Sequence, residues 1–251
     1  MTRRKLGWRV EETCFNAFPS LKQVLLGDWL LRFSKGVSRR GNSVNPLRPA
    51  CSDAPEVIPL CESIYQAQRQ PTIFRVPSLV DPALDRELAA RGYTAEGETC
   101  VLYGDLARLQ GAADPQVQLL TAPIPEWLGA MVTLQGYGPA QREVYERVVG
   151  AIAVPVRFAL LESDGAPAAL AFGALHDGLL CYESVITAPA QRRRGLSRRV
   201  IATLAAWARD SGATGACLQV QSDNTPARVL YDAFGLTREL HRYHYRREPS
   251  A

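Results

Sequence analysis

The sequence predicts an α+β fold in which a mixed, mostly antiparallel sheet is flanked by helices. Of its 251 residues, 47% are hydrophobic, which is enough for a substantial core. Short apolar runs joined by turn signals alternate with stretches of helical periodicity. Both halves show the same approximate order of hairpin, helix, strand, helix and strand. This order suggests a duplicated unit, although no residue-level repeat accompanies it.

In the first half, apolar runs on both sides of Lys35-Gly36 predict a hairpin. A helix is expected where Asp81 is a cap, Pro82 takes the first position and Gly92 follows the end. Periodicity and β-branched runs predict the other elements. In order, the expected elements are a hairpin over 27–46, a helix over 54–69, a strand over 71–76, a helix over 81–92 and a strand over 98–106.

In the second half, the turns Asp164-Gly165 and Asp177-Gly178 predict that three strands form an antiparallel meander. A composition of Gly, Ala, Asp and Pro over 109–115 predicts a linker, so the expected domains are residues 1–110 and 111–251. The expected elements are a helix over 139–152, strands over 154–161, 168–175 and 179–187, a helix over 196–212, a strand over 216–221, a helix over 226–235 and a strand over 239–247.

Composition excludes several classes of function. A net charge of +4 is too mild for non-specific nucleic-acid binding, and no apolar run has the length of a signal peptide or a membrane span. The six cysteines contain no C-x-x-C pair and are expected to be free, mostly buried thiols of a cytoplasmic protein. The three histidines have no carboxylate or thiol at metal-ligand spacing, so no metal is expected.

The stretch "QRRRGLSRR", residues 191–199, holds five arginines around one glycine. It lies between a strand that is expected to end near Thr187 and a helix that is expected to begin near Leu196. A turn that exposes backbone N–H groups at a helix N-terminus forms an anion cradle. Gly195 permits close approach to that backbone, and arginines at the rim add bidentate contacts to phosphate. The pattern indicates a loop that holds one phosphate group.

This stretch and the helix after it resemble the pyrophosphate loop of the GCN5-related N-acetyltransferases (GNAT), whose pattern is Arg or Gln, two residues, Gly, one residue, then Gly or Ala. Arg192 and Gly195 match, and Ser197 replaces the last small residue. Downstream, Asn224 and Tyr231 match the next signature of the family, together with Gly235. The resemblance covers roughly residues 117–247. The first half looks like a degenerate companion copy, as in tandem acetyltransferases.

The resemblance implies direct transfer of an acetyl group from acetyl-CoA to an amine acceptor, with no acylated cysteine and no metal. Glu183, a carboxylate in the apolar strand over 179–187, is a candidate base, because a buried carboxylate needs a partner, a raised pKa or an opening to water. The resemblance implies that Tyr231 protonates the departing thiolate. It also implies a set of residues that bind the cofactor: Val185, Ile186, Thr187, Arg192, Arg193, Arg194, Gly195, Leu196, Ser197 and Asn224.

Each of these roles has an alternative. Tyr231 could merely pack, Glu183 could form an ion pair or face solvent, and Asn224 could cap a helix. Arg39, Arg40 and Asn42 could face an acidic acceptor or be plain surface groups. The acceptor and the oligomeric state stay open. The rival from another class is a non-catalytic module that binds acyl-CoA and a partner.

Overall fold

The computed structural model describes residues 2–249, and the chain divides into two compact units. Unit 1 comprises Met1–Pro19 and Val101–Leu240, and unit 2 comprises Ser20–Cys100 and His241–Ala251. The chain passes from one unit to the other three times: between Pro19 and Ser20, and inside the strands β5 (Thr94–Asp105) and β11 (Arg238–Arg247). The expected boundary between 110 and 111 differs from this partition, because both ends of the chain belong with the opposite half.

Unit 1 contains the meander and the helices that were expected after it. Its strands follow the order β5-β10-β9-β8-β7-β6, in which β9 and β10 run parallel and β6 to β9 are antiparallel. Its further elements are α1 (Arg3–Ala17), β6 (Gln118–Leu120), α4 (Pro125–Gln135), α5 (Pro139–Gly150), β7 (Val156–Ser163), β8 (Ala166–His176), β9 (Leu179–Thr187), α6 (Leu196–Asp210), β10 (Gly215–Gln221) and α7 (Thr225–Phe234), with short 3-10 turns at Leu106–Arg108 and Pro189–Gln191.

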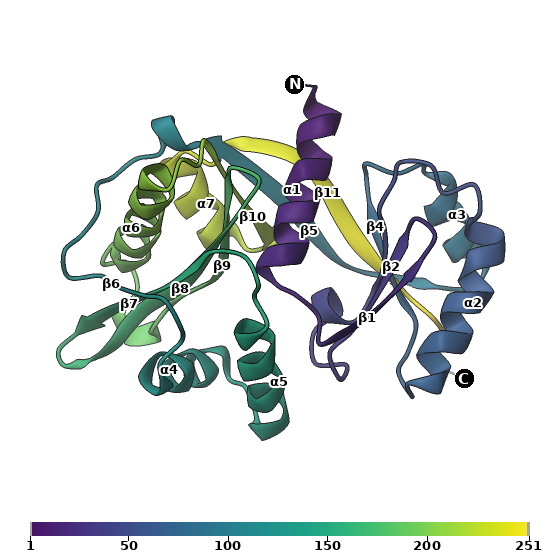
Figure 1. Cartoon of the computed structure of the whole chain (residues 1–251), viewed down its shortest axis with the longest axis horizontal. Coiled ribbons are helices and arrows are strands. Elements are labelled where there is room, and N and C mark those ends of the chain that lie inside the picture. Colours follow the sequence, from purple (N-terminus) through teal and green to yellow (C-terminus); the bar gives the residue numbers. More distant parts are fainter. Residues whose placement is uncertain (1, 250–251) are drawn as a thin grey trace. The chain divides into compact units, whose positions relative to one another are not determined.

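Helices cover both faces of the unit 1 sheet (Figure 1). On one face α6 packs on β7, β8 and β9, and Tyr182 of β9 donates a hydrogen bond to the Ile201 carbonyl of α6 at 3.0 Å. A Cβ at Gly173 would lie only 2.7 Å from Leu180, so glycine is needed under this helix. On the other face, Trp127 of α4 is fully buried against the phenylalanines of β7 and β8.

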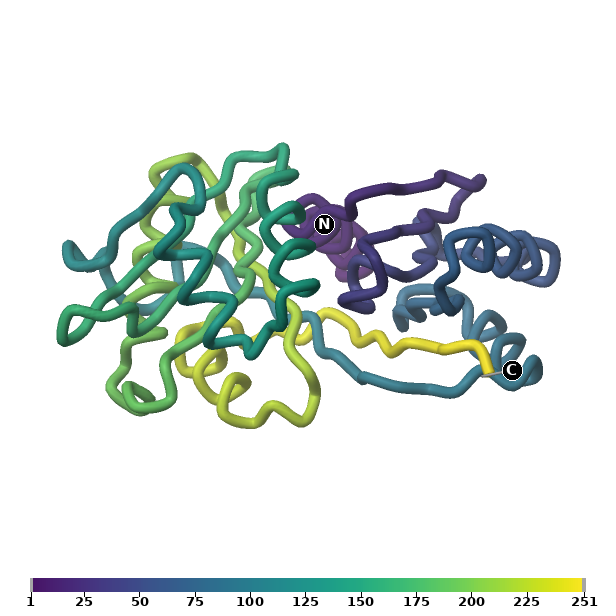
Figure 2. The backbone as a smooth tube through the Cα atoms, turned by 90° about the horizontal axis from the view of Figure 1, so that it is seen from below, coloured from purple at the N-terminus to yellow at the C-terminus, as the bar shows by residue number. Residues whose placement is uncertain are grey.

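Unit 2 is a smaller sheet with two helices. Its strands follow the order β1-β2-β3-β4-β11; β3 and β4 run parallel, and the other pairs are antiparallel. In Figure 2 its trace runs from purple to blue and ends in the yellow of β11. The elements within unit 2 are β1 (Lys22–Leu26), β2 (Trp29–Phe33), a 3-10 turn at Arg39–Gly41, β3 (Val44–Pro46), α2 (Ala54–Ala67), β4 (Ile73–Pro77) and α3 (Ala83–Ala90).

The structure confirms most expected elements and adds four. Asp164 and Asp177 both have positive φ, as the two-residue turns of the meander require. Asp81 accepts a hydrogen bond from the N–H of Ala83 at 2.8 Å, but α3 begins at Ala83 with Pro82 as its N-cap, one residue later than expected. Strands β1 and β6 and helices α1 and α4 were not predicted. The buried residues of α1 include Gly7 and Thr13, so its apolar stripe is weak.

Two of the three polar residues considered as acceptor contacts, Asn42 and Arg39, have partners within unit 2. The Asn42 side chain is buried and accepts from the backbone N–H groups of Ser34 and Gly36, at 2.6 and 2.8 Å. Arg39 pairs with Glu96 at 3.4 Å. No helix in the described part of the chain is long and apolar enough to cross a membrane.

Candidate active site

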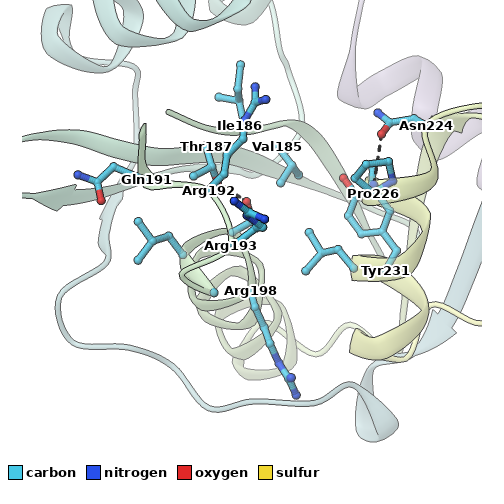
Figure 3. A pocket seen from close by; sticks show the side chains of 15 residues that line it. Val185, Ile186, Thr187, Gln191, Arg192, Arg193, Arg198, Asn224, Pro226 and Tyr231 are labelled. Atoms are coloured by element: carbon cyan, nitrogen blue, oxygen red, sulfur yellow. Dashed lines mark hydrogen bonds between the residues drawn. The ribbon is translucent and has the colours of Figure 1, made fainter. Parts of the chain in front are cut away.

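A pocket opens in unit 1 where β9 ends and α6 and α7 begin, and its volume is about 690 Å³ (Figure 3). It contains nine of the ten residues that the sequence predicted to bind the cofactor, and it also contains Tyr231. The residues that line it are Val185, Ile186, Thr187, Gln191, Arg192, Arg193, Gly195, Leu196, Ser197, Arg198, Asn224, Pro226, Ala227, Leu230 and Tyr231.

The pocket opens where β9 parts from β10 while it stays paired with β8. The β9–β10 pairing runs from Leu179 to Cys181, opposite Cys217, and the pocket begins four residues later at Val185. Between these points the register with β8 shifts, so that Phe172 faces Glu183 while Leu170 faces Ile186. Ser184, at the extra position, has φ 52. This β-bulge bends the strand and turns its last residues toward the pocket.

Residues 191–199, the arginine loop, form one wall of the pocket. Arg193 has φ 61 and Gly195 has φ 75, and Gly195 is the N-cap of α6. Left-handed residues between others turn successive N–H groups toward one side, and the first N–H groups of α6 have no intrahelical partner. Space is open around Gly195, where an added Cβ would meet no atom within 4 Å. The wall is therefore built for an anion.

The charges of the wall have one sign. Arg192, Arg193 and Arg198 line the pocket, and its lining holds no aspartate or glutamate. Arg194 behaves differently from the expectation, because the structure places it outside the lining and its guanidinium donates to the side-chain oxygen of Gln191. Arg194 therefore forms a hydrogen bond within the loop, whereas Arg192 and Arg193 line the pocket.

Ser197, the residue that departs from the family pattern, makes a specific contact. Its hydroxyl shares a short hydrogen bond with the hydroxyl of Thr187, which joins the start of α6 to the end of β9. Glycine or alanine at this position could not make that bond. The substitution therefore keeps a small residue next to the pocket and adds a tie between two of its walls.

Helix α7 supplies the opposite wall. The side-chain oxygen of Asn224 accepts from the N–H of Ala227 at 3.2 Å, so Asn224 caps this helix and also lines the pocket. Tyr231, seven residues later, is 7% exposed. Burial raises the pKa of the Tyr231 hydroxyl, and the charge of Glu183 raises it further, so the phenol stays protonated. Figure 3 shows Tyr231 on α7 and Asn224 just before the start of this helix.

Glu183 lies beside the pocket and not in its lining. Its side chain is 3% exposed, and one carboxylate oxygen is 3.8 Å from the sulfur of Cys181. Burial, and after it the charge of Glu183, raises the pKa of Tyr231, so Glu183 favours the protonated phenol without lining the pocket.

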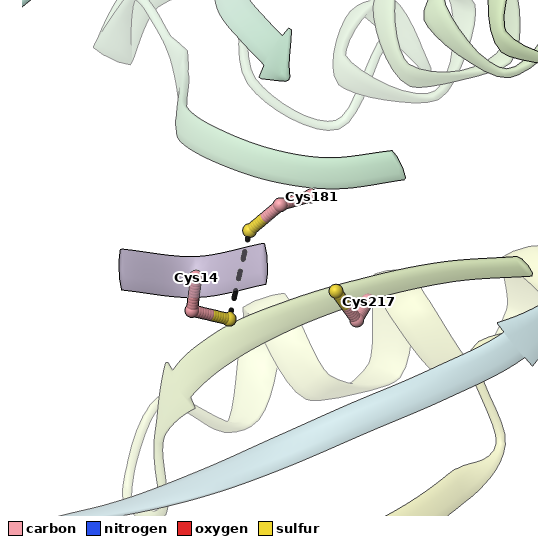
Figure 4. Close-up of side chains that lie close together, drawn as sticks. All are labelled: Cys14, Cys181 and Cys217. Atoms are coloured by element: carbon pink, nitrogen blue, oxygen red, sulfur yellow. Dashed lines mark hydrogen bonds between the residues drawn. The ribbon is translucent and has the colours of Figure 1, made fainter. Parts of the chain in front are cut away.

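Three thiols meet next to Glu183. The sulfurs of Cys14, Cys181 and Cys217 all lie within 4.8 Å of one another, with 3.7 Å between those of Cys14 and Cys181 (Figure 4). The neighbouring Cys14 thiol and burial raise the pKa of Cys181 and Cys217, which keeps these thiols protonated. Spacing along the chain does not indicate this cluster, because its thiols come together only when α1, β9 and β10 pack against one another.

Five lining residues were not predicted: Gln191, Arg198, Pro226, Ala227 and Leu230. Two of them carried a signal in the sequence. Arg198 lies three residues after Gly195, in the first turn of α6, and Pro226 takes an early position of α7. Because side chains at helix starts surround the exposed N–H groups, both positions were candidates for an anion site. Gln191, Ala227 and Leu230 line the pocket only because of how α7 and the arginine loop pack in the folded unit.

Comparison with known proteins agrees with this geometry. The family model described as probable histone acetyltransferase Rv0428c, C-terminal, matches residues 8–246. The uncharacterized N-acetyltransferase YobR of Bacillus subtilis is 25% identical over 244 residues, which cover 95% of this chain and 97% of YobR. Both matches extend over unit 1 and unit 2.

Two solved structures share the fold. A GCN5-related N-acetyltransferase from Kribbella flavida has a TM-score of 0.72 at 16% identity, covering 99% of this chain and 96% of its own. A tandem GNAT protein from the clavulanic acid biosynthesis pathway has a TM-score of 0.65 at 13% identity, covering 99% and 95%. With the family match over nearly the whole chain, these findings establish that the protein belongs to the Rv0428c acetyltransferase family, has the GNAT fold and is an acetyltransferase.

Proposed function

We propose that unit 1 binds acetyl-CoA in the pocket of Figure 3 and transfers the acetyl group directly to an amine. One observation carries the proposal. A single cavity brings together the end of β9, the arginine loop at the start of α6 and the phenol of Tyr231. These three features suit the three parts of the donor: its amide-bearing arm, its pyrophosphate and its thioester.

The pyrophosphate fits the arginine loop. Arg192, Arg193 and Arg198 supply positive charge, and the N-terminus of α6 supplies N–H donors and the positive end of its dipole. The absence of a side chain at Gly195 leaves room for a phosphate group to approach the backbone. The amide groups of the pantetheine arm would pair with the backbone of residues 185–187, where β9 has parted from β10.

Tyr231 is the proposed acid. As the acceptor nitrogen bonds to the thioester carbon, the carbon–sulfur bond breaks and the thiolate must gain a proton. A phenol whose pKa is raised by burial and by Glu183 arrives protonated and lines the pocket. An N–H group of residues 185–187 would polarise the thioester carbonyl.

Glu183 is the proposed base for the acceptor ammonium. Because the carboxylate does not line the pocket, the proton would travel to it through ordered water. If Glu183 instead forms an ion pair, it is not the base, and the acceptor ammonium would lose its proton directly to solvent. The three thiols beside Glu183 take no part in this scheme, since they are buried and protonated outside the pocket lining, and we propose that no metal participates.

The acceptor is an amine whose class the chain leaves open. The family description names histone, which makes protein lysines one class to test beside amino acids and small amines.

We interpret unit 2 as the degenerate companion copy of a tandem arrangement. We place the protein in the cytoplasm because all six cysteines are free and buried, and we assign no nucleic-acid partner because three of the loop arginines face one pocket.

Release of CoA, measured with a panel of amines, tests the transfer and identifies the acceptor class. Tyr231→Phe keeps the ring and removes the proton donor, so turnover should fall by about 10²–10⁴-fold while acetyl-CoA affinity stays nearly constant. Tyr103→Phe is the matched control. Tyr103 is also 7% exposed in unit 1, and its hydroxyl donates to Asp105 away from the pocket lining.

Full turnover by the Tyr231→Phe variant would show that water protonates the thiolate. An equal loss of affinity and rate would assign Tyr231 a binding role instead. Binding of acetyl-CoA by the wild type without CoA release with any amine would favour a non-catalytic acyl-CoA-binding module.

A further inference from the structure

The β-bulge in β9 contains a residue in an unfavourable backbone conformation. Ser184 has φ 52, in the left-handed region that a residue with a side chain rarely adopts. Two residues, Ser184 and Val185, occupy the place opposite Ala171 between the register pairs on either side. Such a conformation persists only when neighbouring groups hold it. The groups that hold Ser184 therefore decide where the next residues of β9 point.

One of these groups comes from a helix far away in the sequence. The hydroxyl of Tyr145 in α5 donates to the Ser184 hydroxyl oxygen at 3.0 Å, across 39 positions of the chain. Tyr145 is 4% exposed, so water competes little for this bond. The contact joins α5 directly to the residue with the left-handed backbone.

The position of the Tyr145 ring is itself determined by packing. The ring stacks on that of Trp127, with 6.5 Å between centroids and 12° between planes, and also contacts Tyr137. Trp127 is fully buried in α4, and its indole N–H donates to the Ala159 carbonyl of β7 at 3.0 Å. A chain of contacts thus runs from β7 through Trp127 and Tyr145 to the bulge.

The bulge separates the two sets of groups that the reaction needs. Glu183 precedes Ser184 and is buried beside the pocket, whereas Val185 follows it and lines the pocket. In a regular strand, successive residues alternate between faces without this break. If Ser184 relaxed to an extended conformation, the N–H groups of residues 185–187 would rotate relative to the pocket.

We propose that Tyr145 is a positioning residue for acetyl transfer, whose hydroxyl holds Ser184 in its left-handed conformation and so orients the β9 backbone toward the thioester. The proposal rests on the proposed function, which places the acetyl donor at residues 185–187. It adds a residue of α5 to a site whose other groups come from β9, α6 and α7. Tyr145 itself does not line the pocket and acts through Ser184.

Tyr145→Phe and Ser184→Ala each remove one side of the contact. Either variant should lower kcat about tenfold, which corresponds to ~1.4 kcal/mol, while KM for acetyl-CoA changes less than twofold. The double variant should be no slower than the single ones, since both remove the same hydrogen bond. Tyr93→Phe is the matched control. Tyr93, 3% exposed in unit 2, donates to Glu62 at 2.7 Å, so its loss should leave kcat unchanged.

Amide hydrogen exchange of the peptide that contains residues 183–187 provides a readout that needs no activity. Exchange there should accelerate at least about fivefold in Tyr145→Phe, and not in Tyr93→Phe. Unchanged exchange in Tyr145→Phe would overturn the proposal, as would additive losses of kcat in the double variant. A wild-type protein that acetylates no amine would overturn the proposed function, while the exchange measurement would still decide whether Tyr145 holds the bulge.

Discussion

Gly195→Asp is the substitution that most directly tests the phosphate wall of the pocket. The backbone of Gly195 has φ 75, and an added Cβ would meet no atom within 4 Å. The folded protein therefore has room for the side chain, and the variant pays only the left-handed backbone cost of about 1 kcal/mol. The bound pyrophosphate would instead meet a carboxylate where the wild type has open space.

The loss of affinity follows from the new charge. Two like unit charges ~5 Å apart at an effective dielectric constant of about 20 repel by about 3 kcal/mol, which weakens binding more than hundredfold. Acetyl-CoA at about 100 times the wild-type Kd should stabilise the wild type by about 2.7 kcal/mol, or roughly 5–10 °C in Tm. At the same concentration the variant should gain about 0.4 kcal/mol, or 1–2 °C.

The assay is thermal unfolding of each protein with and without acetyl-CoA, so that each variant is compared with its own ligand-free Tm. Gly212→Asp is the control, since Gly212 has φ 82, equally open space and a place just after the other end of α6. It should lose ligand-free stability and keep the full acetyl-CoA shift. A Gly195→Asp protein that keeps the full shift would refute the assignment of this loop to the pyrophosphate.

Three further predictions concern other parts of the chain. Arg192→Ala should raise the Kd of acetyl-CoA about tenfold, whereas Arg194→Ala should change it less than twofold because Gln191 already engages that guanidinium; calorimetric titration of both variants compares them directly. Hydrogen bonding from Arg246 holds the pKa of Asp85 below its usual range. This partly exposed pair should contribute at most about 1 kcal/mol of stability, present above the unfolded-state pKa of Asp85 near 4 and lost as pH falls through the lower folded-state pKa. Urea unfolding of Asp85→Asn should therefore differ from that of the wild type at pH 7 and converge with it in acid. All six cysteines are buried, and burial raises the pKa of Cys61 to about 12, so a thiol reagent at pH 8 should label the native protein far more slowly than the unfolded one; rapid native labelling would contradict the burial.

Local patterns in the sequence determined much of the fold and most of the pocket. The Asp-Gly turns at 164–165 and 177–178 require left-handed residues that few other pairs adopt, so the meander could be predicted from neighbouring residues alone. The arginine loop and the start of α7 could also be predicted from neighbouring residues, because Gly195 marks the start of α6 and Asn224 marks the start of α7. These two helix starts form opposite walls of the pocket. Nine of the ten expected cofactor residues line it for this reason.

Contacts between distant segments decided the rest. No pattern near Ser184 shows that a tyrosine 39 residues away meets its hydroxyl, nor that the register shifts there. Helix α1 joins unit 1 although the chain between Ser20 and Cys100 belongs to unit 2, and this return brings Cys14 to the thiols of β9 and β10. Sequence periodicity reports which face of an element is buried, but the partner of that face is chosen by packing over the whole unit.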